Sequence, residues 1–76
     1  MLQPNDDFDV QLGMAIRKAR QDRGLTMRQV QVKCGISTSS LHAIETGKAS
    51  PTVRTLFSLA SAIGVDVEFL LLPQRN

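Results

Sequence analysis

The sequence predicts a small all-α domain built from four or five short helices. Apolar residues recur at helical spacing in separate segments of the chain, and hydroxyl side chains and glycines stand where these segments would begin and end. With 76 residues and 42% hydrophobic content, the chain can form one compact domain with a small core.

The first helix is expected over residues 8–23, where apolar positions repeat every three or four residues and Gly24 provides a C-terminal stop. Residues 1–7, which contain Pro4, are expected to form a flexible N-terminal tail. We assign residues 8–64 to the domain itself and residues 65–76 to a C-terminal dimerisation strand and tail.

Two short helices are expected on either side of Gly35, whose permissive backbone suits a tight turn. Thr26 would cap the first of them and Ser37 the second. The second helix would bury Leu41 and Ile44. Its opposite face would carry small polar side chains: Thr38, Ser39, His42 and Thr46. Such a face suits the floor of the DNA major groove, although an ordinary helical hairpin with a solvated face is the alternative.

A fourth, strongly apolar helix is expected over residues 53–63, after the turn at Pro51 and the cap at Thr52 and before Gly64. The core is expected to comprise twelve residues: Phe8, Leu12, Ile16, Leu25, Val30, Ile36, Leu41, Ile44, Leu56, Phe57, Ala60 and Ile63.

The segment VDVEFLLL at residues 65–72 alternates with a period of two, which favours a β-strand, and a short fifth helix is the alternative. A single strand cannot satisfy its own backbone groups, so we expect it to pair with the same segment of a second copy in a homodimer. The residues that would meet there are Val65, Val67, Phe69 and Leu71. A helical tail would also leave apolar side chains exposed, so both alternatives predict a dimer.

The charge of the chain is concentrated in its middle. Residues 17–54 contain eight of the nine basic residues and only two acidic ones, Asp22 and Glu45. A basic centre between acidic ends is typical of proteins that bind a polyanion, although a routine solvated surface would look similar.

Several classes of function are not expected. A single cysteine, Cys34, and a single histidine offer no metal-ligand spacing and no internal disulfide, and Cys34 is expected to pack as a small apolar group. No catalytic grouping or phosphate loop is present, so we expect neither an enzyme nor a cofactor. No apolar run reaches the roughly 20 residues of a membrane span, and we expect a cytoplasmic, nucleoid-associated protein.

The run GLTMRQVQVKCGISTSSLHAIETGKASPTVRTLFSLASAIGV resembles the helix-turn-helix repressors of the Cro and lambda-repressor (XRE-like) type. The resemblance extends from about Leu12 to Val65 and includes the G-x-T entry, the G-[IV]-S turn, the E-x-G ending and the final L-x-x-[IL]-A-x-A-[IL]-G-V helix. The strand-like tail looks more like the HipB-type antitoxin subgroup, whose C-terminal strands pair across a dimer.

The resemblance implies a compact lambda-repressor-like DNA-binding fold and a division of roles among residues. The recognition helix would read bases through Thr38, Ser39, His42, Ala43 and Thr46, with solvation or a phosphate contact as the alternative for His42. Phosphate contacts would come from Arg28, Ser40, Lys48 and Arg54, together with Lys33 and Arg17.

Two further positions complete the implied scheme. The family commonly has glutamine directly after the entry threonine, but this chain has Met27, so the brace of the recognition helix is absent or is supplied otherwise, for example by Arg28. Glu45 would be repelled by DNA if it faced outward, and the resemblance instead implies a structural ion pair with Arg20.

The function that follows is a sequence-specific, double-stranded-DNA-binding transcriptional repressor that acts as a dimer on a palindromic operator, as the autoregulatory antitoxin of a toxin–antitoxin pair. The alternative is a protein-interaction module whose main role is to bind and neutralise a kinase-like toxin. A third alternative is an RNA-binding or coactivator module.

Overall fold

The chain folds into five helices, as the computed structural model shows for residues 4–72, with side chains described from Phe8 onward. In chain order these helices are α1 (Pro4–Asp22), α2 (Met27–Cys34), α3 (Thr38–Glu45), α4 (Val53–Ile63) and α5 (Val67–Leu71). The all-α prediction is therefore confirmed, and the described part of the chain contains no strand.

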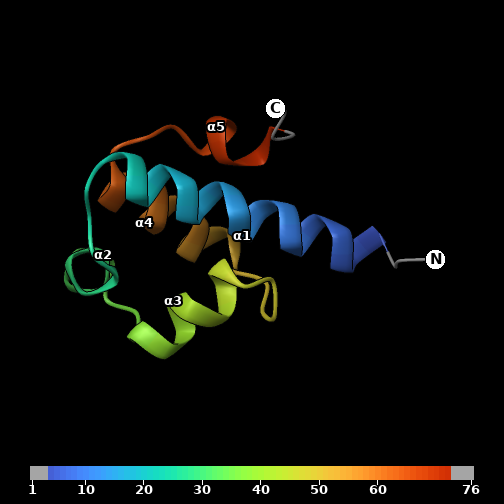
Figure 1. Cartoon of the computed structure of the whole chain (residues 1–76), viewed down its shortest axis with the longest axis horizontal. Helices are drawn as coiled ribbons and strands as arrows, with labels where there is room; N and C mark the ends of the chain where they lie inside the picture. The colour runs from blue at the N-terminus through green and yellow to red at the C-terminus, as the bar shows by residue number, and fades with distance from the viewer. Residues whose placement is uncertain (1–3, 73–76) are drawn as a thin grey trace.

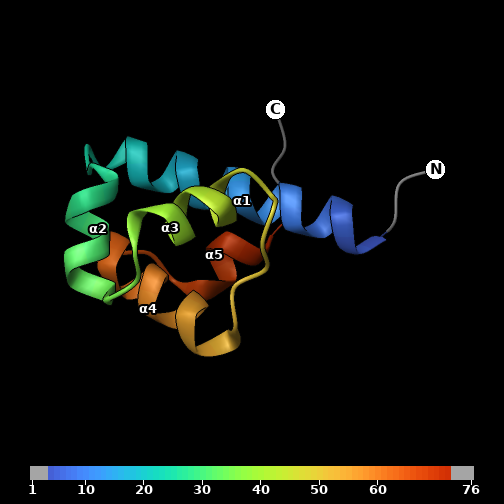
Figure 2. The ribbon, with the colours of Figure 1, turned by 90° about the horizontal axis from the view of Figure 1, so that it is seen from below.

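Helix α1 lies at the centre of the arrangement. Helix α5 packs along one side of α1, α3 lies on the opposite side, and α4 runs behind α1 (Figure 1). Helix α2 closes one end of the domain by packing on α3 and α4 (Figure 2). Because α3 forms the outer edge of the domain, one of its faces is left open to solvent.

The first helix begins earlier than expected, at Pro4 rather than Phe8. Proline has no N–H group to lose, and its fixed φ angle suits the first turn of a helix. Residues 4–7, which were expected to belong to a flexible tail, are therefore helical, and residues 1–3 lie outside the described residues. This early start makes α1 project beyond the other helices at its N-terminal end (Figure 1).

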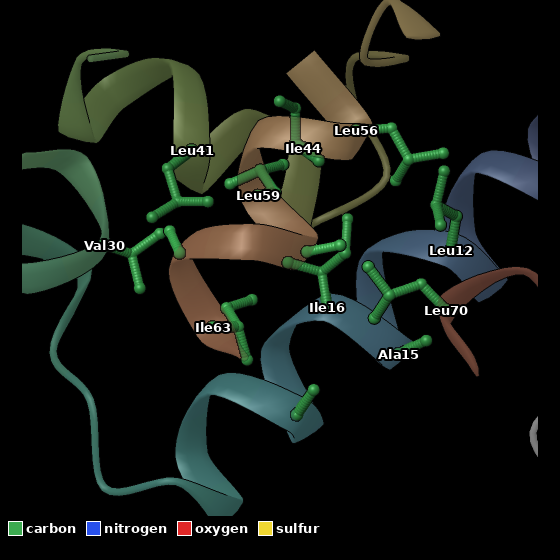
Figure 3. Packing of buried hydrophobic residues seen from close by; sticks show 13 residues of the cluster. Leu12, Ala15, Ile16, Val30, Leu41, Ile44, Leu56, Leu59, Ile63 and Leu70 are labelled. Atoms are coloured by element: carbon green, nitrogen blue, oxygen red, sulfur yellow. The ribbon is translucent and has the colours of Figure 1, made fainter. Parts of the chain in front are cut away.

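The core lies between all five helices (Figure 3). Its fully buried large side chains are Ile16, Val30, Leu41, Leu59 and Leu70. Ten of the twelve predicted core residues are buried or pack against the core. The other two predictions were wrong, because Phe8 and Phe57 are 50% and 59% exposed. Phe8 lies on the end of α1 that projects beyond the other helices. Phe57 follows Leu56 in α4 and falls outside the set of residues that face the core at helical spacing, which are Leu56, Leu59, Ala60 and Ile63.

The predicted C-terminal strand was also wrong. Residues Val67–Leu71 form the short helix α5, and Leu70 is buried against the core with 1% of its surface exposed. A helix forms its backbone hydrogen bonds within one chain, so this segment needs no second chain as a hydrogen-bond partner. For example, the Leu72 N–H group donates to the Glu68 carbonyl oxygen at 3.1 Å. Among the predicted dimer contacts, Val65 and Val67 pack against the core of their own chain, whereas Phe69 and Leu71 remain exposed.

Two properties of the described residues bear on function. None of their helices has the length and apolar character that crossing a membrane requires. They also contain no group of three or more histidine, cysteine, aspartate or glutamate side chains that could hold a metal ion.

Candidate nucleic-acid interface

Helices α2 and α3 are joined by a tight turn, and a hydroxyl side chain caps each of them. The Thr26 Oγ1 atom accepts from the Gln29 N–H group at 3.1 Å, and the Gln29 side-chain oxygen accepts from the Thr26 N–H group at 2.8 Å, which forms a complete capping box. Gly35 ends α2 in the left-handed conformation at φ +77°, which a residue with a Cβ atom rarely adopts. Ser37 then caps α3 by accepting from the Ser40 N–H group at 3.0 Å. These local interactions fix the direction in which α3 leaves the turn.

The two faces of α3 differ in chemistry. Leu41, Ile44 and Glu45 are buried on the inner face. The predicted base-contacting side chains occupy the other face: Thr38, Ser39, His42 and Thr46 are exposed, and Ala43 is half-buried. At 3.6 residues per turn these five positions span an arc of about 140°. The structure therefore brings the five predicted base contacts together on one exposed surface, and we call this the outer face of α3.

Hydrogen bonds within the chain limit what the hydroxyl groups of α3 can offer to a ligand. The Thr46 hydroxyl group donates its proton to the His42 carbonyl oxygen at 2.8 Å, so its lone pairs remain available to accept. The Ser37 hydroxyl group donates to Ser40 Oγ at 2.9 Å, which leaves the Ser40 proton available to donate outward. In this arrangement Ser40 can donate to a phosphate oxygen, and Thr46 can accept from an amino group.

The C-terminal end of α3 is attached to α1 by a buried ion pair. Arg20 donates to both carboxylate oxygens of Glu45, from Nε at 2.7 Å and from Nη2 at 3.0 Å, and its Nη1 atom donates to the Leu25 carbonyl oxygen at 2.8 Å. The hydrogen bond to Glu45 raises the pKa of the Arg20 guanidinium above its ordinary value, and burial opposes that rise. The guanidinium stays charged throughout the accessible pH range, and its two hydrogen bonds hold the Glu45 carboxylate away from the outer face of α3.

The positive charge of the surface remains largely unpaired. Of the eight basic residues between positions 17 and 54, Arg20 pairs with Glu45, and Lys18 pairs with Asp22 at 2.9 Å on the surface. The other six are exposed and have no carboxylate partner among the described side chains: Arg17, Arg23, Arg28, Lys33, Lys48 and Arg54. The net charge of +6 in this segment is therefore available to an anionic ligand.

The predicted phosphate contacts are only partly gathered around α3. Arg28 lies in the first turn of α2, Ser40 lies on α3, and Lys48 and Arg54 lie in the following loop and the first turn of α4. Lys33 instead borders a groove with Cys34, Phe57 and Ser61, at the junction of α2 with α4. Arg17 is exposed on α1 and forms no ion pair within the described region.

Some features that position the site were not foreseen. Met27, which occupies the usual position of the bracing glutamine, is half-buried and packs against the core. Gln29 forms the capping box instead, and the T-x-x-Q spacing at residues 26–29 was a sequence signal for it.

The loop after α3 is attached to α1, because the Ser50 hydroxyl group donates to the Asp9 carboxylate. No local sequence pattern predicts a contact between residues 41 positions apart.

The helix-turn-helix geometry is matched by a family model described as "HTH_3: Helix-turn-helix", over residues 16–70. This range covers more than half of the chain. The chain belongs to the HTH_3 helix-turn-helix family. It is therefore a helix-turn-helix regulator of transcription, a class of protein that binds double-stranded DNA.

Relatives of this HTH_3 domain carry matching names. It is 37% identical over 62 residues to an uncharacterised HTH-type transcriptional regulator, y4dJ, of Sinorhizobium fredii, and the match covers 82% of this chain and 80% of that protein. It is 39% identical over 56 residues to the HTH-type transcriptional regulator DdrOP3 of Deinococcus deserti, where the match covers 74% of this chain but 43% of the longer protein.

A solved structure shares the fold over nearly the whole chain. The hypothetical transcription factor NHTF from Neisseria superposes with a TM-score of 0.82 at 25% identity, covering 96% of this chain and 84% of that one. The lambda-repressor-like fold expected from the sequence is thus the observed fold of this HTH_3 protein.

Proposed function

We propose that this protein is a transcriptional repressor that binds a specific double-stranded operator through the outer face of α3. The observation that carries the proposal is the placement of this neutral, hydrogen-bonding face beside unpaired cations. Hydroxyl and imidazole groups can bond to base edges without a fixed charge, whereas arginine and lysine hold phosphates independently of sequence. A protein bound to an operator within its own promoter would block RNA polymerase and so repress transcription of its own gene.

The proposed active form is a dimer on a palindromic operator. One α3 helix reads only a few base pairs, and two copies related by a twofold axis present their helices to successive major grooves about 34 Å apart. Phe69 and Leu71 supply apolar surface for the contact, because both side chains are exposed. Both belong to α5, and this helix lies on the side of α1 opposite α3 (Figure 1). In the proposed dimer, α5 makes the contact between the two copies that the sequence analysis assigned to a C-terminal strand.

The antitoxin role is a narrower form of the same proposal. Its support in the sequence was the strand-like tail, and because that segment is helical this support is gone. We therefore place the general repressor function first and binding of a kinase-like toxin second. A gene for a kinase-like protein next to the gene for this chain, and co-purification of the two products, would favour the antitoxin role.

The test of the repressor function is selection of duplexes from a random-sequence library, followed by footprinting on the DNA upstream of the gene. We expect a palindromic site bound by two protein copies, with sedimentation analysis showing a dimer in the complex. Recovery of no preferred sequence, or an equal affinity for single-stranded RNA, would contradict the proposal.

Replacing the base-reading hydroxyl groups should reduce specificity. In the Thr38→Ala/Ser39→Ala variant we expect a loss of about 1–3 kcal/mol of discrimination between the selected duplex and a scrambled one, because hydrogen bonds to base edges are lost. The stability should change by less than about 0.5 kcal/mol, because both side chains are exposed. Competition binding against the scrambled duplex measures the first quantity, and thermal unfolding measures the second.

Replacing Arg28 should weaken binding to all duplexes alike. Arg28→Ala removes one proposed phosphate contact, so the slope of log affinity against log salt concentration should decrease by about 1 in magnitude, without a change in sequence preference. Arg23→Ala is the matched control, because Arg23 is an exposed cation to which we assign no contact. Equal effects of the two substitutions on the salt slope would contradict the proposed placement of the phosphate backbone.

A further inference from the structure

Helix α1 comes unusually close to the last turn of α3 at Gly13. Gly13 is buried in the interior of α1, where alanine would be the better helix former. A Cβ atom added to Gly13 would clash with the Ile44 carbonyl oxygen and would lie 2.8 Å from the carbonyl oxygen and 3.0 Å from the carbonyl carbon of Glu45. These atoms belong to the backbone, so they cannot move aside unless α3 moves with them.

The same side of α1 carries the other attachments of α3. Gly13, Ile16 and Arg20 follow each other at spacings of three and four residues, so they share one face of the helix. Ile16 packs into the hydrophobic core (Figure 3). Arg20 donates hydrogen bonds to both carboxylate oxygens of Glu45 on α3, at 2.7 Å and 3.0 Å. A bidentate pair tolerates little displacement, so its geometry depends on the close approach that Gly13 permits.

The loop that follows α3 is held against α1 as well. A Cβ atom at Gly47 would lie 2.8 Å from the Val10 Cγ2 atom and 2.9 Å from the Val10 Cα atom. The end of α3 and the start of its loop therefore rest directly on the α1 backbone, whereas the start of α3 is held by the Ser37 cap and by Leu41.

We infer that Gly13 is a positioning residue for DNA recognition. Its missing side chain lets α3 rest on α1, and this contact sets the position and tilt at which the outer face of α3 meets the major groove. The role of Gly13 in DNA recognition rests on the proposed function, whereas its contact with α3 does not. Base-edge hydrogen bonds require placement within about 0.5 Å, so a small outward shift of α3 weakens base contacts, whereas flexible arginine and lysine side chains keep their phosphate contacts.

The test compares Gly13→Ala with a matched control, Gly24→Ala. Gly24 has φ +68° and no atom within 4 Å of its added Cβ, so alanine there strains the backbone without pushing on α3. The probes are the duplex that the wild-type protein selects from a random library and a scrambled duplex of the same composition. If Gly13→Ala is partly unfolded, trimethylamine N-oxide is added equally to all samples until its circular dichroism matches that of the wild type.

We expect Gly13→Ala to reduce the ratio of affinities for the selected and scrambled duplexes by about tenfold or more, while its affinity for the scrambled duplex stays within about twofold of wild type. The Arg20 Nε–H signal in ¹⁵N NMR spectra of the free protein should shift and exchange faster with solvent. Gly24→Ala should lower the stability but keep both the ratio and the Arg20 signal of the wild type.

Four results separate the failure of this inference from the failure of the proposed function. A Gly13→Ala variant that keeps the wild-type ratio overturns the positioning role. Equal loss of the ratio in Gly24→Ala also overturns it, because the effect would then follow stability rather than the position of α3. A wild-type protein that selects no duplex overturns the proposed function, and an unchanged Arg20 signal in Gly13→Ala then overturns the geometric argument independently of DNA.

Discussion

Glu45→Ala is expected to lower the free energy of unfolding by about 3–5 kcal/mol, because it leaves the Arg20 guanidinium buried without its anionic partner. Arg20 and Glu45 are only 8% and 4% exposed, so water cannot replace the lost carboxylate oxygens. In a small domain this loss is a large fraction of the total stability. Urea unfolding followed by circular dichroism measures it.

Two variants serve as controls for this result. Asp22→Ala breaks the exposed pair with Lys18 and should cost about 0.5 kcal/mol or less, because that pair is solvated on both sides. The double variant Arg20→Met/Glu45→Leu replaces the buried pair with apolar side chains and should recover most of the loss. If Glu45→Ala were no more destabilising than Asp22→Ala, Glu45 would have to be accessible to water in solution.

Leu70→Ala is expected to lower the free energy of unfolding by about 2–5 kcal/mol, because it opens a cavity between α5 and the core. Leu71→Ala, one residue further along, should change the stability by no more than about 0.5 kcal/mol, because Leu71 is 44% exposed. Thermal unfolding at matched low and high protein concentrations compares the two variants, since the strand expected from the sequence would form only in a homodimer. A strand that alternates from Val65 to Leu71 would bury Leu71 and expose Leu70. A larger loss of stability in Leu71→Ala than in Leu70→Ala would therefore contradict the helix and favour the strand.

The helices between Thr26 and Gly64 could be predicted because their signals are local. Each begins at a hydroxyl residue that caps the first turn, and α2 and α4 each end at a glycine in the left-handed conformation. The tail could not be predicted in the same way. Apolar and polar residues alternate only from Val65 to Phe69, and residues 69–72 are all apolar. The outcome depended on whether Leu70 could find a buried position against α1, which is a property of the assembled domain.

In the candidate interface, too, features set within one helix could be predicted from the sequence, whereas features set by the packing of helices could not. The outer face of α3 follows from the spacing of residues within one helix, so the sequence was sufficient to gather Thr38, Ser39 and His42. The placement of Lys33 at the junction of α2 with α4 depends on how helices pack, and no pattern in one segment specifies it. Gly13 was missed for a similar reason, because an isolated glycine inside a helix gives no indication of which backbone approaches it.

The separation of α3 into an apolar, anchored half and a solvated half has a consequence for how such regulators diversify. Substitutions on the solvated half leave Leu41, Ile44 and Glu45 in place, so they should change folding stability by only about 0.5 kcal/mol. Under the proposed function, the same substitutions would alter which bases are preferred. A protein that works as proposed would therefore acquire new operators by successive single substitutions, each of which leaves the fold intact.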